Sequence, residues 1–368
     1  MRFKTYKMED ILESLIDYRG KTPQKSDKGI MTLSAKSVRD GYIDYSQCYF
    51  ISEEEYKRFM VRGFPKIGDV LMTTEAPLGV TARLDREDIA LAQRLLTLRG
   101  KTGVLDTGYL YYYLRSPVGQ GKLKERQTGT TVTGIKQAEF RKIKVDLPDI
   151  EPQRKVASVL ETIDEKIKCN NAINENLTQQ AQAIYADIFI TNADPTWPLG
   201  HLSDLITVRY GKDHKKLDDG PYPVYGSGGV MRYVERPIYE KESVLIPRKG
   251  TLNNVMYVNE PFWSVDTMFF TEMKLPDVAK FVFHFVKSKD LASLNAGSAV
   301  PSMTTDILNA MELYIPDAET LKRFESIVGP MYRAMQHNSK ESKKRAAVRD
   351  TLLPRLMSGE LDVSELDI

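Results

Sequence analysis

Two long stretches of this chain carry the hydrophobic spacing of coiled-coil helices. In each stretch, seam positions alternate spacings of four and three residues, which places them on one face of a helix. The first seam consists of Val156, Leu160, Ile163, Ile167, Asn170, Asn174, Leu177, Ala181, Ile184 and Ile188. The second lies 168 residues later and consists of Phe324, Val328, Met331, Met335, Asn338, Ser342, Arg345, Arg349, Leu352 and Leu356. Because each stripe must be buried, and the nearest self-similar stripe is the other one, the pattern predicts that the two helices pair.

Polar residues occupy the middle of both seams, at Asn170, Asn174, Asn338 and Ser342. A buried polar seam residue can fix the register of a helix pair. Alternatively, the pair loosens at its centre and these side chains face solvent. The sequence supports both interpretations equally.

The seams belong to a longer internal repeat. Residues 129–155 (GTTVTGIKQAEFRKIKVDLPDIEPQRK) align without a gap on residues 297–323 (GSAVPSMTTDILNAMELYIPDAETLKR), at a constant offset of 168. Identities are few, but the punctuation matches at Gly129 and Gly297, Val132 and Val300, Pro148 and Pro316, Asp149 and Asp317, and Glu151 and Glu319. The repeat predicts two copies of a globular domain, each followed by a helix.

The length of the helices suggests a spacer. A helix from Glu151 to Phe189 would be about 58 Å long at roughly 1.5 Å per residue. Paired antiparallel, two such helices would hold their preceding globular copies at opposite ends, related by an approximate twofold axis. Twofold DNA-binding proteins contact half-sites separated by whole helical turns of about 34 to 36 Å, so a spacer of this length suits a bipartite target.

The globular copies have the short strands and single helix of mixed α/β units. In the first copy we expect strands over 69–74, 80–84 and 90–98 and a helix over 109–116. In the second copy the corresponding stretches are 243–250, 253–258, 267–273 and 280–288. Aromatic residues within these stretches are interpreted as core residues and not as base-stacking platforms.

These patterns predict an α+β fold in which two mixed α/β domains are separated by an antiparallel pair of long coiled-coil helices and related by a pseudo-twofold internal duplication. The predicted boundaries are 1–147 for the first domain, 148–192 for the central helix, 193–315 for the second domain and 316–368 for the C-terminal helix and tail.

Composition narrows the class of protein. Cys48 and Cys169 lie far apart and form no ligand set, which argues against a disulfide framework or a zinc site and for a reducing compartment. No uncharged apolar run is long enough to span a bilayer, so we expect a cytoplasmic protein without membrane contact. Residues 1–147 hold 26 Lys and Arg against 19 Asp and Glu, a balance of +7, whereas the remainder holds 26 against 31, a balance of −5. A basic segment favours contact with DNA phosphates, although many surfaces with this imbalance have no polyanionic partner.

Motifs for catalysis are missing. No Pro-Pro pair occurs, so the Asn/Asp-Pro-Pro-aromatic motif of amino-methyltransferases is absent. Two GKT tripeptides have Leu15 and Leu95 where a phosphate loop needs glycine. Asp149 and Asp164 match a loose nuclease pattern, but along one helix they would lie about 22 Å apart, too far to share a cation. We predict no active site and no metal site.

Several fragments, in order, resemble the specificity subunits of type I restriction-modification enzymes, and the resemblance covers nearly the whole chain. The fragments in the first copy are RGKTPQ from Arg19, GIMTLSAKSVRDGYI from Gly29, FISEEEY from Phe50, GDVLMT from Gly68, LGV from Leu78 and GTTVTGI from Gly129. Those in the second copy are WPLGHLSDLITVRYGK from Trp197, YPVYGSGGV from Tyr222 and IPRKGTLNNV from Ile246, followed by LLPRLMSGEL from Leu352. One departure concerns the start of the helices, which is PDIEPQRK at Pro148 but PDAETLKR at Pro316, and it puts partner docking at the second start in doubt.

The resemblance implies a non-catalytic, sequence-specific DNA-binding subunit with two target recognition domains, each reading one half of a gapped DNA sequence. It implies partners as well: double-stranded DNA, adenine-specific methyltransferase subunits and an ATP-dependent restriction subunit. The cofactors S-adenosylmethionine, ATP and magnesium are expected on those partners and none on this chain.

Residues that read DNA are sought among polar side chains in flexible loops, because base edges are recognised by hydrogen bonds. The candidates in the first copy are Lys21, Thr22, Lys36, Ser37, Arg39, Thr73, Thr74, Thr130 and Thr131. The candidates in the second copy are Lys212, Tyr225, Ser227, Arg248, Lys249, Asn253, Asn254 and Ser298. Glycine-flanked polar loops also make simple turns, so some of these residues are expected to have no contact with DNA.

Two other functions compete with this interpretation. One is a stand-alone DNA-modifying enzyme, for which the sequence shows no catalytic domain. The other is a coiled-coil assembly protein without DNA readout, against which the polar loops and the basic first domain argue only mildly.

Overall fold

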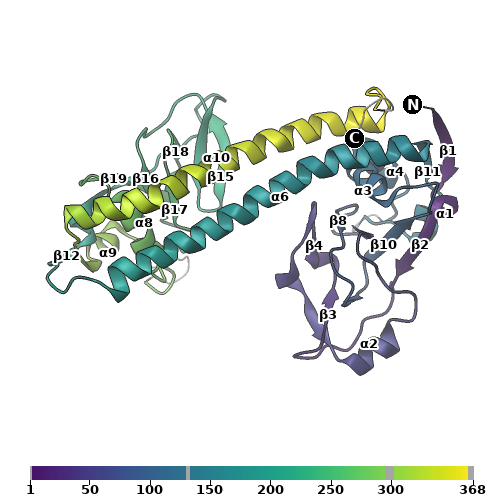
Figure 1. Ribbon diagram of the computed structural model, residues 1–368, viewed down its shortest axis with the longest axis horizontal. Helices are drawn as coiled ribbons and strands as arrows, with labels where there is room; N and C mark the ends of the chain where they lie inside the picture. Colours follow the sequence, from purple (N-terminus) through teal and green to yellow (C-terminus); the bar gives the residue numbers. More distant parts are fainter. Residues whose placement is uncertain (1, 130–132, 295–301, 364–368) are drawn as a thin grey trace. The chain divides into compact units, whose positions relative to one another are not determined.

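The computed structural model describes residues 2–129, 133–294 and 302–363 (Figure 1). Close contacts divide the chain into two compact units: unit 1 is Met1–Asn170 with Lys340–Ile368, and unit 2 is Asn171–Ser339. Each unit contains one globular copy and a part of each of the two long helices.

The core of unit 1 is an antiparallel sheet of four strands in the order β2-β10-β7-β8. The strands are β2 (Leu12–Asp17), β10 (Leu95–Gly100), β7 (Val70–Thr73) and β8 (Thr81–Arg83). All four side chains of β7 are buried, because α3 (Thr107–Arg115) packs against this sheet and its tyrosines fill the core. The four-residue apolar run of β7 is the pattern of a strand buried on both faces.

Smaller sheets surround this core. Strand β3 pairs antiparallel with β6 and parallel with β9, β4 pairs with β5, and β1 pairs with β11. Their bounds are β1 (Phe3–Lys7), β3 (Ile30–Leu33), β4 (Val38–Arg39), β5 (Tyr42–Ile43), β6 (Tyr49–Ile51), β9 (Ile89–Leu91) and β11 (Lys144–Pro148). The short helices of this unit are α1 (Met8–Ile11), η1 (Ala35–Ser37), η2 (Tyr45–Gln47), α2 (Glu53–Phe59), α4 (Pro117–Glu125) and α5 (Gln137–Arg141).

Unit 2 repeats this topology, which confirms the internal duplication. Its four-stranded sheet has the order β13-β19-β16-β17, and its three-stranded sheet again has a central strand, β14, that pairs antiparallel with β15 and parallel with β18. The strands are β12 (Leu199–His201), β13 (Ile206–Tyr210), β14 (Tyr222–Gly226), β15 (Gly229–Val234), β16 (Ser243–Pro247), β17 (Met256–Val258), β18 (Trp263–Ser264), β19 (Met268–Met273) and β20 (Glu312–Tyr314). The short helices are α7 (Leu202–Leu205), α8 (Ala279–Lys287) and α9 (Thr305–Asn309).

One expected element of the first copy was wrong. Residues 90–98 do not form a single strand, because the chain leaves β9 in one sheet and enters β10 in another. At the change of sheet, the backbone N–H of Ala92 donates to Leu33 O (2.8 Å), and Arg94 adopts a positive φ of 71°. In the sequence this break coincides with the polar pair Gln93 and Arg94, which separates two buried apolar runs that were interpreted as one strand.

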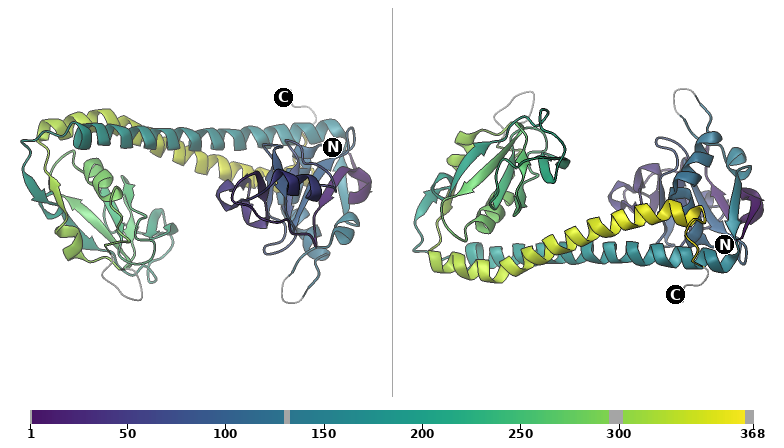
Figure 2. Two further views of the ribbon diagram at one scale, coloured as in Figure 1. Left: turned by 90° about the horizontal axis from the view of Figure 1, so that it is seen from below. Right: turned by 90° about the horizontal axis from the view of Figure 1, so that it is seen from above.

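The long helices are α6 (Ile150–Ala186), which continues into a π-helical turn at Asp187–Thr191, and α10 (Ala318–Met357). In unit 1, Asp164 of α6 contacts Arg349 while Asn170 contacts Ser342, so residue numbers rise on one helix as they fall on the other. In unit 2, Asn174 contacts Asn338 in the same antiparallel sense. The antiparallel pairing predicted from the seams is confirmed (Figure 2).

The chain ends in unit 1. Leu356, Met357 and Val363 are buried in the same core as α3, and Gly359 lies against the ring of Phe3. Within the described parts of the chain, no helix is apolar over a length that would cross a bilayer.

Candidate nucleic-acid interface

Polar loops of the second copy gather around the loop between β16 and β17. The backbone N–H of Arg248 donates to Thr267 O (2.9 Å), and Arg248 O accepts from the N–H of Met303 (2.9 Å). Lys249 forms an isolated β-bridge with Ser302. These bonds hold the loop beside the segment that leads into α9.

The turn between β14 and β15 packs onto the same loop. Asn254 Nδ2 donates to Ser227 O (2.8 Å). Gly250 has a φ of +86°, and a Cβ there would lie 2.8 Å from Ser227 Oγ, so only glycine fits without strain. We call the resulting surface the second loop surface; it consists of residues 210–212, 225–229, 248–255, 266–267 and 302–303.

Cationic side chains project from the second loop surface. Lys212 and Lys249 are exposed, and the backbone of Lys212 is fixed by Trp263 Nε1, which donates to Lys212 O (2.9 Å). The guanidinium of Arg248 lies 5.3 Å from the ring centroid of Tyr210. Burial raises the pKa of the Tyr225 hydroxyl, which keeps it protonated as a hydrogen-bond donor.

The first copy has the same backbone arrangement. The N–H of Thr74 donates to Arg94 O (3.0 Å), and Thr74 O accepts from the N–H of Ile135 (2.9 Å). Glu75 forms an isolated β-bridge with Gly134, which corresponds to the bridge between Lys249 and Ser302 in the second copy. We call residues 19–22, 74–80, 93–94 and 133–135 the first loop surface. The two surfaces therefore share a framework and differ in side chains.

The side chains of the first loop surface are largely paired with one another. Arg94 Nε forms an ion pair with Glu75 (2.8 Å), Gln93 Nε2 donates to Thr22 Oγ1 (3.1 Å), and Arg19 Nη2 donates to Ile135 O (3.0 Å). Beside them lies an open cavity of about 460 Å³. Its lining includes Ala76, Pro77, Leu78, Gln120, Leu123, Lys124, Gln127 and Thr133.

The structure brings some of the predicted DNA-reading residues together. Lys212, Tyr225, Ser227, Arg248, Lys249 and Asn254 lie on the second loop surface, and Lys21 and Thr22 lie on the first. Lys36 and Arg39 are exposed, but they lie near the β4–β5 hairpin, outside both surfaces. Thr130, Thr131 and Ser298 lie outside the described residues.

Three predicted residues have buried side chains, which places those side chains away from a DNA contact in this structure, and a fourth is exposed but has its amide hydrogen-bonded within the protein. Ser37 and Thr73 are buried; Ser37 Oγ accepts from the N–H of Ser34 (3.3 Å), and Thr73 Oγ1 donates to Pro77 O (2.6 Å). Thr74 is buried next to Thr73, with no hydrogen-bond partner for its hydroxyl among the described residues. Asn253 is exposed, but its amide bonds Asp290 Oδ1 (3.0 Å) and the N–H of Ala292 (3.0 Å). These residues were chosen because they are polar and lie in loops, and that pattern does not indicate whether a side chain is buried or already hydrogen-bonded.

Sequence reasoning also missed residues that shape the two surfaces. Tyr210, Asp266, Gln93 and Arg94 contact candidate residues. Gln93 and Arg94 were expected to lie within a strand, and Tyr210 and Asp266 were assigned neither to a strand nor to the site. Their contacts in the folded chain identify them.

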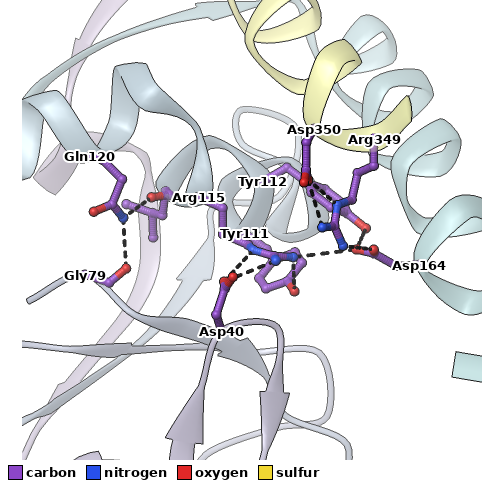
Figure 3. A network of polar contacts seen from close by, with 10 residues as sticks. Asp40, Gly79, Tyr111, Tyr112, Arg115, Gln120, Asp164, Arg349 and Asp350 are labelled. Carbon is purple, nitrogen blue, oxygen red and sulfur yellow. Dashed lines mark hydrogen bonds and ion pairs between the residues drawn. The ribbon is translucent and has the colours of Figure 1, made fainter. Parts of the chain in front are cut away.

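Unit 1 joins its globular copy to the helix pair through an ionic network (Figure 3). Asp164 of α6 accepts from Tyr112 Oη (2.9 Å) and from Arg349 Nη1 of α10 (2.6 Å). Arg115 lies 3.6 Å from Asp164 and also pairs with Asp40 (3.1 Å). One carboxylate thus ties α3, α6 and α10 together.

Unit 2 joins α8 to the helix pair through an ion pair between Lys280 and Glu325 of α10 (2.9 Å) and through a neutral histidine. His284 of α8 occupies the position of Tyr112, with Nδ1 2.8 Å from Gln182 Oε1 and Nε2 2.9 Å from the Tyr332 hydroxyl. Burial lowers the pKa of His284 to about 4, so the imidazole is neutral at pH 7. In the neutral form, Nδ1–H donates to Gln182 and Nε2 accepts from Tyr332.

Every predicted seam residue is buried or half-buried, whereas Ile173 and Val348, which lie off the seam, are 42% and 52% exposed. Asn170 is 1% exposed, and its Nδ2 donates to Glu341 Oε2 (2.8 Å) and lies 3.3 Å from Ser342 Oγ. Asn338 Nδ2 donates to Asn174 Oδ1 (3.0 Å). These directional contacts support the interpretation that the polar seam fixes the register.

The start of the two helices also differs for a structural reason. Gln153 of α6 is fully buried and bonds Val104 O (2.9 Å), Pro148 O (2.8 Å) and the N–H of Asp106 (3.0 Å). At the matching position of α10, Leu321 is buried in the apolar core of unit 2. The difference between Gln153 and Leu321 therefore changes how each helix packs on its own globular copy.

Comparisons with known proteins agree with this architecture. The sequence model of the family described as type I restriction modification DNA specificity domain matches residues 2–179 and 196–342. The type I restriction enzyme MjaIX specificity subunit of Methanocaldococcus jannaschii is 23% identical over 359 residues, covering 86% of this chain and 82% of that protein. A putative type I specificity subunit of Mycoplasma genitalium is 22% identical over 278 residues, covering 68% of this chain and 71% of that protein. The crystal structure of an S subunit from the M. genitalium type I system is similar at a TM-score of 0.67 and 18% identity, over 96% of both chains.

Proposed function

Because the chain belongs to the family of type I restriction-modification DNA specificity domains, we propose that each of its two copies reads one half of a bipartite DNA target through its loop surface. The chain is a non-catalytic DNA-recognition component, like the specificity subunits that it resembles. The observation that carries the assignment of the surface is the shared framework of the two loops, on which the two copies present different side chains.

Physical features of the loop surfaces support the proposal. Lys21, Lys212 and Lys249 are exposed and available to phosphates, while backbone bonds fix the loops that carry them. A recognition surface needs such a division, because phosphate contacts set the position and base contacts set the specificity. A framework with variable side chains lets two copies of one fold read two different half-sites.

Partner subunits complete the proposed function. We infer that the chain docks adenine-specific methyltransferase subunits and an ATP-dependent restriction subunit, and that S-adenosylmethionine, ATP and magnesium bind to those partners. The helix pair is the proposed element that sets the gap between half-sites, and the predicted boundaries at 147, 192 and 315 remain part of this proposal.

Salt dependence of DNA binding tests the assignment of the loop surface. We would replace Lys212 and Lys249 by glutamine in the full chain, assemble it with its methyltransferase subunit and measure affinity for a mixed-sequence duplex by fluorescence anisotropy at several salt concentrations. Each lost phosphate contact is expected to reduce the slope of log K against log salt by about 0.9.

Lys241 and Lys274 provide the matched control, because they are exposed lysines of the same copy outside the second loop surface. Their replacement by glutamine is expected to leave the slope unchanged. If the slope falls equally in both variants, or does not fall in the Lys212 and Lys249 variant, the second loop surface is not the DNA-binding surface.

A further inference from the structure

Arg248 occupies a position where the fold itself does not require arginine. Its counterpart in the first copy is Thr74, because the two residues follow matching strands and make the same two backbone hydrogen bonds, with Thr267 and Met303 in one copy and with Arg94 and Ile135 in the other. Thr74 is buried, whereas the side chain of Arg248 is half-buried and reaches the second loop surface. The long cationic side chain is therefore a feature of the second copy alone.

The guanidinium of Arg248 is held in place by two neighbours. Nη1 donates to Asp266 O (3.3 Å), and the guanidinium carbon lies 5.3 Å from the ring centroid of Tyr210, whose side chain is 51% exposed. Tyr210 pairs with Phe269 as Asp17 of the first copy pairs with Leu96, so the aromatic partner is also specific to the second copy. The first copy therefore has neither the arginine nor the tyrosine at the matching backbone positions.

An arginine arranged in this way suits one kind of ligand. A guanidinium group has five N–H donors in a planar fork. In Arg248, only one of these donors has a hydrogen-bond partner among the described residues. A fork held by an aromatic ring loses little conformational freedom on binding. In the major groove of DNA, guanine alone presents two acceptors, O6 and N7, that match this fork, and arginine to guanine is the commonest specific contact.

We propose that Arg248 is a specificity-determining residue that reads a guanine in the half-site of the second copy, with Tyr210 as its positioning residue. The inference rests on the proposed DNA-reading function and adds a base and a residue to it. Phosphate binding by Arg248 is the competing role, and it predicts a different result, because a lost phosphate contact weakens binding to all sequences alike.

Selection from random DNA separates these roles. The full chain, assembled with its methyltransferase subunit, would be used to select duplexes with a long randomised region, and the bound sequences would be read for wild type, Arg248→Ala, Arg248→Lys and Tyr210→Leu. Arg236→Ala serves as the control for charge, because Arg236 is an exposed arginine of the same copy outside the second loop surface.

The inference predicts a G·C pair in one half-site of the wild-type motif and a loss of preference of roughly 5- to 150-fold at that pair in Arg248→Ala. Arg248→Lys and Tyr210→Leu are expected to lose part of this preference, while the other half-site stays unchanged in all variants and Arg236→Ala selects the wild-type motif. A wild-type motif in which Arg248→Ala relaxes no G·C pair would overturn the inference and leave the proposed function standing. Selection of no motif by the wild type would remove both.

Discussion

Asp164 and His284 both hold a globular copy against the helix pair, but Asp164 does so through ion pairs and His284 through neutral hydrogen bonds. The carboxylate of Asp164 is partly exposed and is balanced by Arg349 and Arg115. The imidazole of His284 is 1% exposed and stays neutral between a glutamine and a tyrosine. Each residue joins its own globular copy to the helix pair, so the two joints respond to different changes in solution.

Arg349→Ala is expected to destabilise unit 1 by about 2 kcal/mol, because it removes a charged hydrogen bond and leaves Asp164 with weaker compensation. The measurement is the free energy of unfolding in urea. Arg333→Ala is the control, since Arg333 is an exposed arginine of the same helix, and it should change the free energy by less than about 0.5 kcal/mol. Equal effects of the two variants would contradict the role of the Asp164 network.

His284 predicts a pH dependence of stability. Its pKa is lowered from 6.5 to about 4 in the folded state, so the unfolded chain binds the proton more readily between these values. The stabilisation is complete above pH 6.5 and is lost as the pH falls toward 4, by roughly 3 kcal/mol at most.

Urea unfolding at pH 7.5 and at pH 5 measures this loss. His284→Gln should lose the part of the pH dependence that His284 contributes, whereas His337→Gln, at an exposed histidine, should retain the wild-type behaviour. A wild-type pH dependence in His284→Gln would show that another group carries the effect.

At the scale of elements, the polar centre of the helix pair sets its alignment. The hydrogen bond from Asn170 is the largest cause that lowers the pKa of Glu341, so this carboxylate is charged beside the buried amide. A hydrophobic seam alone would tolerate a shift by one heptad, whereas a shifted pair would leave Asn170 and Asn174 without these partners. The contacts favour one register over the alternatives.

Asn170→Asp places a buried carboxylate against Glu341 and is expected to destabilise unit 1 by at least about 2 kcal/mol at pH 7. The loss should shrink at low pH, where one of the two carboxyl groups takes up a proton. Asn176→Asp, at an exposed position of the same helix, is the control for the added charge. Denaturant unfolding of both variants at pH 7 and pH 5 checks the prediction, and a loss of equal size in Asn176→Asp would contradict it.

Elements with a strong period were predictable from sequence, and elements defined by contacts were not. The seams predicted α6, α10 and their antiparallel pairing, because a long stripe has few ways to be buried. The break between β9 and β10 was missed because the polar pair Gln93 and Arg94, which interrupts the apolar run, does not by itself show a change of sheet. The burial of Gln153 was missed because its partners are backbone groups, which leave no trace in sequence.

At the scale of the whole molecule, the internal duplication allows the two copies to be compared with each other, residue by residue. Matching backbone bonds at Thr74 and Arg248 identify a shared framework, and the side chains mounted on it differ between the copies. Sequence alone predicted the repeat and several loop residues, but it also chose Ser37 and Thr73, whose side chains are buried. Loop polarity cannot separate a side chain that caps its own turn from one that faces a partner, because both are favoured by the same residue types.

The central claim is that the two copies read separate halves of one DNA target. The most direct test is selection of random duplexes by the wild-type chain with its methyltransferase subunit, followed by selection with a variant altered only in the uncharged polar pair of the first loop surface, Thr22→Ala with Gln93→Ala. We predict a motif of two half-sites flanking an unspecified gap, of which the variant changes only one. A single continuous motif, or a change in both half-sites, would contradict the claim.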